Sequence, residues 1–311
     1  MSIGADPTGG PGVGAVTSDP GGQAADGEGR SGEAGGIAAV EFQPEVAVQA
    51  GAAPSAAVLP TTSALRAVDL TLSYGSRVVL AGVTADIQMG AVTALIGPTG
   101  SGKTTLLRTF NRMNDKVTGY RHTGDVFLDG RSIWSPTVEL MTLRRKVGML
   151  FQRPNPFPMS IMDNVVAGVR AHKMAKGSEA REIARQRLTE VGLWDAVSGR
   201  LKDSPFRLSG GQQQLLCLAR ALAIGPEVLL LDEPTSSLDP VATESIEKLI
   251  RTLVPNITVI IVTHNLAQAR RVADRTMFLY QGHLVEHGPT QQVFEDPTRE
   301  ETAHYVSGRF G

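Results

Sequence analysis

The chain has 311 residues, of which 41% are hydrophobic, so it can bury the core of one large domain or two small ones. Its 30 basic and 31 acidic residues nearly cancel, which argues against a nucleic-acid-binding protein with a strongly basic face. The one cysteine, Cys217, excludes an internal disulfide and fits a reducing compartment. No apolar run reaches the ~18 residues of a membrane-spanning helix.

Residues 1–60 differ in composition from the rest of the chain. They hold 13 of the 34 glycines and seven acidic residues, but only Arg30 as a base and Phe42 as an aromatic residue. A segment this poor in apolar side chains buries too little surface to offset the entropy lost on ordering. We therefore expect residues 1–60 to be a disordered, Gly/Ala-rich acidic tail and residues 61–311 to be the folded domain. The tail lacks the charged start and leucine-rich stretch of a secretory signal, which favours a cytoplasmic protein.

From residue 61 onward, short β-type runs alternate with helical patterns. The first part predicts an antiparallel layer at 65–74 and 77–87, a buried strand at 91–97, a helix at about 102–113, and strands at 124–130 and 146–152. A helical region follows at about 158–223. The last part predicts strands at 227–233 and 257–264, a helix near 240–253, a further helix, and a β-rich segment at 276–288. Continuous apolar strands flanked by helices predict an α/β fold whose parallel sheet is covered on both faces, with 158–223 as a helical subdomain.

A glycine-rich loop between the strand at 91–97 and the next helix carries the first chemical motif. The loop fits the pattern G-x-x-x-x-G-K-[ST] and is followed by a second threonine: Gly97, Pro98, Thr99, Gly100, Ser101, Gly102, Lys103, Thr104 and Thr105. Glycines let backbone N–H groups turn inward around phosphate oxygens. We expect Lys103 to reach the β and γ phosphates of a nucleoside triphosphate, and the Thr104 hydroxyl to ligate Mg²⁺. A chance glycine turn would lack the strand before it and the helix after it.

The run "VLLLDEP" at 228–234 is an apolar strand that ends in two carboxylates. We expect Asp232 to lie near the Mg²⁺ ion and Glu233 to polarise an attacking water molecule. The alternative is an ordinary strand end with solvated acids, and the phosphate loop elsewhere in the chain makes that alternative weaker.

A second glycine motif, "RLSGGQQQ" at 207–214, precedes a helical pattern. Ser209, Gly210, Gly211 and Gln212 would offer a further set of N–H donors to a phosphate, although an ordinary capped helix start would look the same. One nucleotide cannot easily use both glycine loops of one chain. The two loops could serve the same nucleotide if they came from two different chains, each of which completes the nucleotide site of the other.

Taken in order, these motifs resemble those of the ATP-binding cassette ATPases. The resemblance covers residues 65–290 and rests on Lys103, Gln152, "LSGGQ" (208–212), "LLLDEP" (229–234), "SSLDP" (236–240) and "VTHN" (262–265). It implies a P-loop fold in which Tyr74 stacks on adenine and Gln152 senses Mg²⁺ and the γ-phosphate. It also implies that Ser209 and Gly211 contact the opposing chain's nucleotide, that Asp239 lies at the dimer seam, and that His264 contacts the γ-phosphate. By themselves, Tyr74 and His264 would be an ordinary strand aromatic and a strand-end histidine.

Other stretches are similar to the ATPase subunits of bacterial phosphate importers, above all actinobacterial and mycobacterial ones. These stretches are "FNRMND" (110–115), "FQRPNPFPMSIMDNV" (151–165), "SGGQQQ" (209–214) and "YVSGRFG" (305–311). Leu215 departs from the wider family, which has an arginine there, so the polar contact of that arginine is in doubt; on a helix the leucine can simply pack. The acidic tail is also additional to the family pattern.

The segment 153–160, "RPNPFPMS", is rich in proline, which disfavours a regular helix and makes a stiff turn directly after Gln152. We expect Phe157, Met159 and Ile161 to dock against a membrane subunit, since a loop without a partner would seldom carry them. A plain Pro-rich loop is the alternative.

The sequence is therefore interpreted as the ATPase of a phosphate importer, a peripheral protein on the cytoplasmic face of the membrane. The cofactors implied are ATP and Mg²⁺. The partners implied are a second copy of the chain, two transmembrane permease subunits and, indirectly, an extracytoplasmic phosphate-binding protein, with no nucleic acid. Import of another solute is the runner-up, because no residue here touches the solute. Cassette ATPases that act on DNA or ribosomes carry long coiled coils or two cassettes, and neither pattern is visible.

Overall fold

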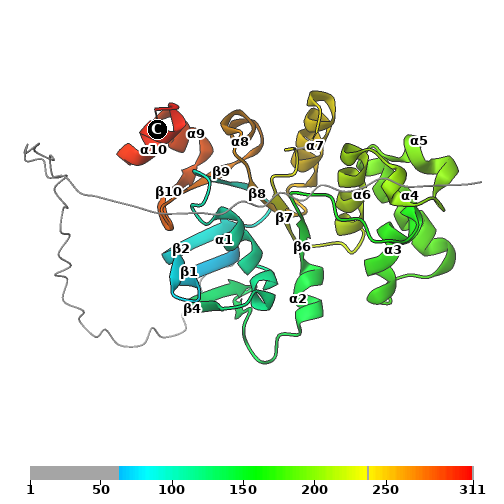
Figure 1. Cartoon of the computed structure of the whole chain (residues 1–311), viewed down its shortest axis with the longest axis horizontal. Helices are drawn as coiled ribbons and strands as arrows, with labels where there is room; N and C mark the ends of the chain where they lie inside the picture. The colour runs from blue at the N-terminus through cyan, green and yellow to red at the C-terminus, as the bar shows by residue number, and fades with distance from the viewer. Residues whose placement is uncertain (1–62, 237, 310–311) are drawn as a thin grey trace, which may run out of the picture. The chain divides into compact units, whose positions relative to one another are not determined.

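The computed structural model describes residues 63–236 and 238–309, so the predicted tail at 1–60 lies outside the described residues. A six-stranded sheet runs through the centre of the described domain (Figure 1). Its strands, in spatial order, are β10 (His283–Pro289), β9 (Arg275–Tyr280), β3 (Val92–Ile96), β8 (Thr258–Val262), β7 (Val228–Asp232) and β6 (Val147–Leu150). All neighbours pair in parallel except β10, which runs antiparallel to β9 at one edge. The predicted β-rich segment at 276–288 is therefore a hairpin.

A second sheet is antiparallel, as expected for the runs at 65–74 and 77–87. Its order is β2 (Arg77–Gln88), β1 (Ser63–Tyr74), β4 (Tyr120–Leu128) and β5 (Arg131–Ser132). The strand predicted at 124–130 is β4, which pairs with β1 and so belongs to this sheet.

Helices follow most of the parallel strands, and the predicted helical region at 158–223 forms a group of its own beyond β6 (Figure 1). That group is α3 (Ile161–Ala171), α4 (Gly177–Glu190), α5 (Trp194–Val197), the short helices η2 (Ser198–Arg200) and η3 (Pro205–Arg207), and α6 (Gly210–Leu222), in which α3, α4 and α6 pack on one another. The others are α1 (Lys103–Thr109), η1 (Met113–Lys116), α2 (Leu140–Lys146), α7 (Pro240–Leu253), α8 (Leu266–Val272), α9 (Thr290–Glu295) and α10 (Glu300–Val306). No helix in these described ranges is long and apolar enough to cross a membrane.

The helix after the glycine loop is shorter than the predicted 102–113. It ends at Thr109, and Arg112 takes a left-handed conformation (φ 57°) before η1 begins. Side chains satisfy the end of the helix, because the Thr109 hydroxyl and the Asn114 amide both donate to Thr105 O at 2.8 Å.

The parallel strands are buried on both faces, which explains their uninterrupted apolar sequences. On β7, Leu229 and Leu231 join a core with α3, α6, α7 and α8, whereas Val228 and Leu230 join a core with α1 and the antiparallel sheet. One face of the parallel sheet is thus covered by helices and the other by α1 and the antiparallel layer. Since β3, β8, β7 and β6 are neighbours, the segments that follow them lie along one edge of the sheet.

Candidate functional site

The glycine loop occupies this edge, between β3 and α1, and two of its glycines leave no space for a side chain. Gly97 has φ 142° and Gly102 φ 99°, a region that L-residues rarely adopt. A Cβ atom at Gly97 would lie 2.0 Å from Leu279 O, and one at Gly102 would lie 2.5 Å from Leu80 Cδ2. At Gly100 (φ 82°) a Cβ atom would meet nothing within 4 Å, so the loop is open on that side. Neighbouring strands and backbone conformation together require glycine in this loop.

Lys103 lies within the loop and is 5% exposed. Its Nζ donates to the carbonyl oxygens of Gly97 and Pro98, both at 2.8 Å. Burial lowers the pKa of Lys103, and the nearby charges of Glu233 and Asp232 oppose that shift. The ammonium group is thus held by carbonyls of the glycine loop itself, within the electrostatic influence of two carboxylates.

Thr104 and Asp232, the two residues expected near Mg²⁺, lie in contact although they come from α1 and the end of β7. The Thr104 hydroxyl donates to Asp232 Oδ1 at 2.9 Å, and Asp232 is 1% exposed. A hydroxyl beside a carboxylate suits Mg²⁺, which binds oxygen ligands and usually keeps water and substrate phosphates in its shell. Sequence reasoning missed Arg108, whose Nη2 lies 3.4 Å from Asp232 Oδ2. Its spacing of four residues from Thr104 places both on one helix face and could have indicated it.

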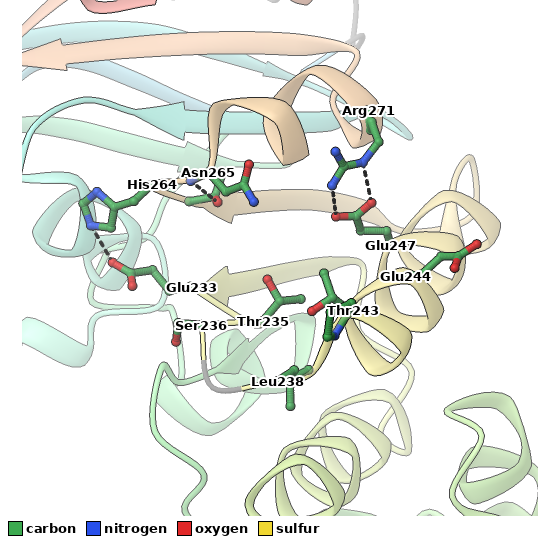
Figure 2. A pocket seen from close by; sticks show the side chains of 12 residues that line it. Glu233, Thr235, Ser236, Leu238, Thr243, Glu244, Glu247, His264, Asn265 and Arg271 are labelled. Atoms are coloured by element: carbon green, nitrogen blue, oxygen red, sulfur yellow. Dashed lines mark hydrogen bonds and ion pairs between the residues drawn. The ribbon is translucent and has the colours of Figure 1, made fainter. Parts of the chain in front are cut away.

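Glu233 lies between two of the other predicted residues. Gln152 Nε2 donates to Glu233 Oε2 at 2.8 Å. His264 Nε2 lies 2.7 Å from Glu233 Oε1, as Figure 2 shows. The backbone of Glu233 is left-handed (φ 46°), and its N–H donates to Val262 O at 3.0 Å, at the end of β8. The three side chains follow β6, β7 and β8, and the structure brings them together at one carboxylate.

The second glycine motif begins α6. Ser209 Oγ accepts from Gln212 N at 3.3 Å, and Gln212 Oε1 accepts from Ser209 N at 3.2 Å, which is a capping box. Ser209 and Gly210 are exposed, and Gly211 and Gln212 are half-buried. The ordinary helix cap considered above is thus present, and a contact of these residues with a second chain's nucleotide stays a prediction.

Tyr74 and Asp239 have local partners in the structure. The Tyr74 hydroxyl donates to Asn114 Oδ1 at 3.1 Å, and the ring lies 5.8 Å from that of Tyr120. Asp239 caps α7, because its Oδ1 accepts from Val241 N and Ala242 N at 3.0 Å. Stacking of Tyr74 on adenine and a place for Asp239 at a dimer seam stay predictions.

The Pro-rich segment has two exposed apolar side chains. Phe157 is 41% and Met159 40% exposed. The expectation that Ile161 also faces a partner is wrong, because Ile161 is the first residue of α3 and is fully buried in the core. Leu215 packs against that core, consistent with a plain packing role in place of the usual arginine.

Comparison with known proteins identifies the family. Residues 80–236 match the family model described as ABC transporter, and one relative is 65% identical over most of both chains. The chain belongs to the ABC transporter family. That relative is the phosphate import ATP-binding protein PstB of Mycobacterium intracellulare, with 82% of this chain and 90% of the relative covered. PstB 2 of Mycobacterium tuberculosis, also named a phosphate import ATP-binding protein, is 63% identical over 85% of this chain and 94% of its own length.

Solved structures agree with this ABC assignment. A dimeric ATP-binding cassette in a post-hydrolysis state, bound to ADP and Pi, is similar with a TM-score of 0.64 at 29% identity, over 73% of this chain and 98% of that chain. The predicted fold class, a P-loop ATPase of the ABC type with an antiparallel layer, is confirmed.

Proposed function

We propose that this ABC protein is the ATP-hydrolysing subunit of an importer that takes up inorganic phosphate across the cytoplasmic membrane. The observation that carries the ATPase assignment is the carboxylate of Glu233, held by Gln152 at 2.8 Å and His264 at 2.7 Å, directly after Asp232. The relatives from Mycobacterium intracellulare and Mycobacterium tuberculosis, both named for phosphate import, support the choice of solute.

The residues of the site divide the chemistry among them. The loop 97–104 would hold the phosphates of ATP, with Lys103 supplying a cation to the β and γ oxygens. Glu233 would orient the attacking water molecule and accept its proton, while His264 fixes the carboxylate and contacts the γ-phosphate.

Thr104, Asp232 and Gln152 are the residues that would hold Mg²⁺. The amide nitrogen of Gln152 bonds Glu233, which leaves the amide oxygen for a cation. When bound, Mg²⁺ neutralises charge on the β and γ phosphate oxygens.

A second copy of the chain would complete each site. Ser209, Gly210, Gly211 and Gln212 at the start of α6 would contact the nucleotide held by the loop of the other copy, with Asp239 at the seam between them. ATP binding would then close the dimer, and hydrolysis with product release would reopen it. The dimeric cassette bound to ADP and Pi supports this arrangement.

The two permease subunits would dock near the Pro-rich segment, where Phe157 and Met159 are exposed. The buried Asn164 holds this segment, since its side chain accepts from Phe157 N at 2.7 Å and donates to the carbonyls of Phe157 and Met159 at 3.1 and 3.3 Å. Because the segment starts directly after Gln152, a shift at the γ-phosphate would be transmitted to a docked subunit. The ATPase would thus lie on the cytoplasmic face of the membrane, with an extracytoplasmic phosphate-binding protein as an indirect partner.

Uptake of phosphate by cells tests the proposed solute. A strain whose only copy carries Lys103→Ala, with other phosphate importers disabled, should lose uptake of radiolabelled phosphate and keep uptake of sulfate. Lys248→Ala is the matched control, because that side chain is 72% exposed on α7 and should leave both rates unchanged. Normal phosphate uptake in the Lys103→Ala strain, or an equal loss of sulfate uptake, would favour another solute.

A further inference from the structure

A charged and polar network joins α7, α8 and the loop after Glu233, on the wall of a cavity of about 810 Å³ (Figure 2). Glu247 of α7 accepts two hydrogen bonds from Arg271 of α8, at 2.8 Å from Nε and 2.7 Å from Nη2. Glu247 is only 8% exposed, and the Arg271 guanidinium holds the pKa of this carboxyl below its usual range. The paired planar groups fix α7 and α8 relative to each other.

Gln268 extends this pair to the loop. Its Nε2 donates to Glu247 Oε1 at 3.1 Å and to Thr235 Oγ1 at 2.9 Å, and the side chain is 1% exposed. The carboxylate can only accept, so it sets which way the amide points. Among the described residues, none hydrogen-bonds Gln268 Oε1. A buried amide with an unpaired oxygen costs stability that an apolar side chain of the same size would not, so packing alone does not account for glutamine at this position.

The network reaches both loops that carry the Glu233–His264 pair. Thr235 lies two residues after Glu233, and Gln268 lies four residues after His264. Gln268 N also donates to Asn265 Oδ1 at 3.0 Å, which fixes the residue next to His264. The two loops are therefore joined once at Glu233–His264 and again at Thr235–Gln268.

We infer that Gln268, oriented by Glu247 and Arg271, is a positioning residue that keeps the Glu233 carboxylate in contact with His264 during ATP hydrolysis. This inference rests on the proposed ATPase function and goes beyond it, because Gln268 touches neither reacting group. Without the amide, Thr235 is released from α8, and the carboxylate of Glu233 spends less time in the geometry that activates water. Misplacement of a catalytic group by about 1 Å costs on the order of 10²-fold in rate. Most contacts to the phosphates would come from the loop 97–104, which the network does not include, so binding of ATP should change little.

The test compares Gln268→Leu in two backgrounds of the purified full chain, with phosphate release and ATP affinity as readouts. In the parent background we expect kcat to fall about tenfold, with KM for ATP within about twofold. In a Glu233→Gln background, where the water-activating carboxylate is already lost, the same substitution should cost less than about twofold. A merely structural role would lower kcat by the same factor in both. An equal loss in both backgrounds, or an unchanged kcat in the parent, would overturn the inference.

Gln292→Leu is the matched control. Gln292 of α9 also donates its Nε2 to a buried glutamate, Glu286 Oε1 at 2.8 Å. Among the described residues, the hydrogen-bond partners of these two side chains lie at 286–302, outside the loops that carry Glu233 and His264. We expect this variant to lose thermal stability while its kcat stays at the parent value.

Thr235 supplies a second pair of variants in case Gln268→Leu does not fold. Thr235→Val keeps the shape and removes the acceptor of the Gln268 amide, whereas Thr235→Ser keeps the hydroxyl. The valine variant should lose kcat and the serine variant should retain it; equal kcat values would overturn the inference. A parent chain that does not hydrolyse ATP would refute the proposed function, whereas an active parent matched by every variant would refute only the role of Gln268.

Discussion

Two backbone positions at the site take conformations that most side chains avoid, for different reasons. Glu233 has φ 46° and tolerates it because its N–H bonds Val262 O and its carboxylate is held from two sides. Such strain tends to occur at functional sites, where the surrounding contacts maintain it. Gly97 has φ 142°, and Leu279 O of the neighbouring strand approaches so closely that any Cβ atom would clash. The first position uses its side chain, and the second can have none.

Gly97→Ala should therefore be much more destabilising than an alanine at another positive-φ glycine. Gly130→Ala is the control, because Gly130 has φ 71° on the turn between β4 and β5 and a Cβ atom there would meet nothing within 4 Å. We expect the free energy of unfolding to fall by about 2–3 kcal/mol more for Gly97→Ala, from overpacking and backbone strain together. Denaturant melts of both variants without nucleotide measure this. Equal midpoints would show that the β9 strand moves away at no cost.

At the scale of elements, the site is made by strand order. Neighbouring strands β3, β8, β7 and β6 are followed by Thr104, His264, Glu233 and Gln152 in turn. This order explains how side chains as far apart in the sequence as Thr104 and Asp232, 128 positions, come into contact. The glycine loop and the strand ending at Asp232 could be predicted from sequence, because a short motif and an apolar run each report local structure. The order of the strands in the sheet depends on contacts between residues far apart in the sequence, so a short sequence motif cannot predict it.

Long-range contacts also explain why the sequence could not indicate Gln268 as a site residue or Ile161 as a buried one. Gln268 and Glu247 lie 21 residues apart in two ordinary amphipathic helices, so their hydrogen bond has no motif. Ile161 continues an apolar, Pro-rich stretch, and only the Ser160 cap, whose Oγ accepts from Asp163 N at 3.0 Å, shows that a buried helix begins there. Tertiary packing, rather than composition, assigns each of these residues its environment.

Element geometry also predicts how defects in the two glycine motifs combine. Ser209→Arg places bulk where the start of α6 should approach a partner's γ-phosphate, and Lys103→Ala removes the main cation on the phosphates. Each alone should disable both sites of a dimer, whereas a mixed dimer has one site with both lesions and one with neither. Tagged mixed dimers reconstituted with the permease should recover part of the ATPase activity, as phosphate release would measure. Each variant mixed with itself is the control and should recover nothing.

At the scale of the whole molecule, the two glycine motifs belong to different parts of the parallel sheet. The phosphate loop follows β3, whereas α6 packs beside β6, three strand positions further along the sheet. With neighbouring strands about 4.8 Å apart, that offset alone is about 14 Å. Ser209 and Gly210 are exposed, as the proposed shared site requires, and under that proposal a lone chain would hold an incomplete site.

Specific ATPase activity should consequently depend on protein concentration. If only the dimer is competent, activity per chain rises with concentration until the dimer is saturated, while ATP binding to the loop of the monomer persists at every concentration. Steady-state phosphate release across a dilution series, with the mass of the species followed by sedimentation in the same buffer, measures both quantities. Glu233→Gln should shift the monomer–dimer equilibrium toward the dimer in ATP, since it binds ATP but hydrolyses it on the order of 10²–10⁴-fold more slowly. Constant activity per chain down to a proven monomer would contradict the shared site, because a single chain would then provide every group that hydrolysis needs.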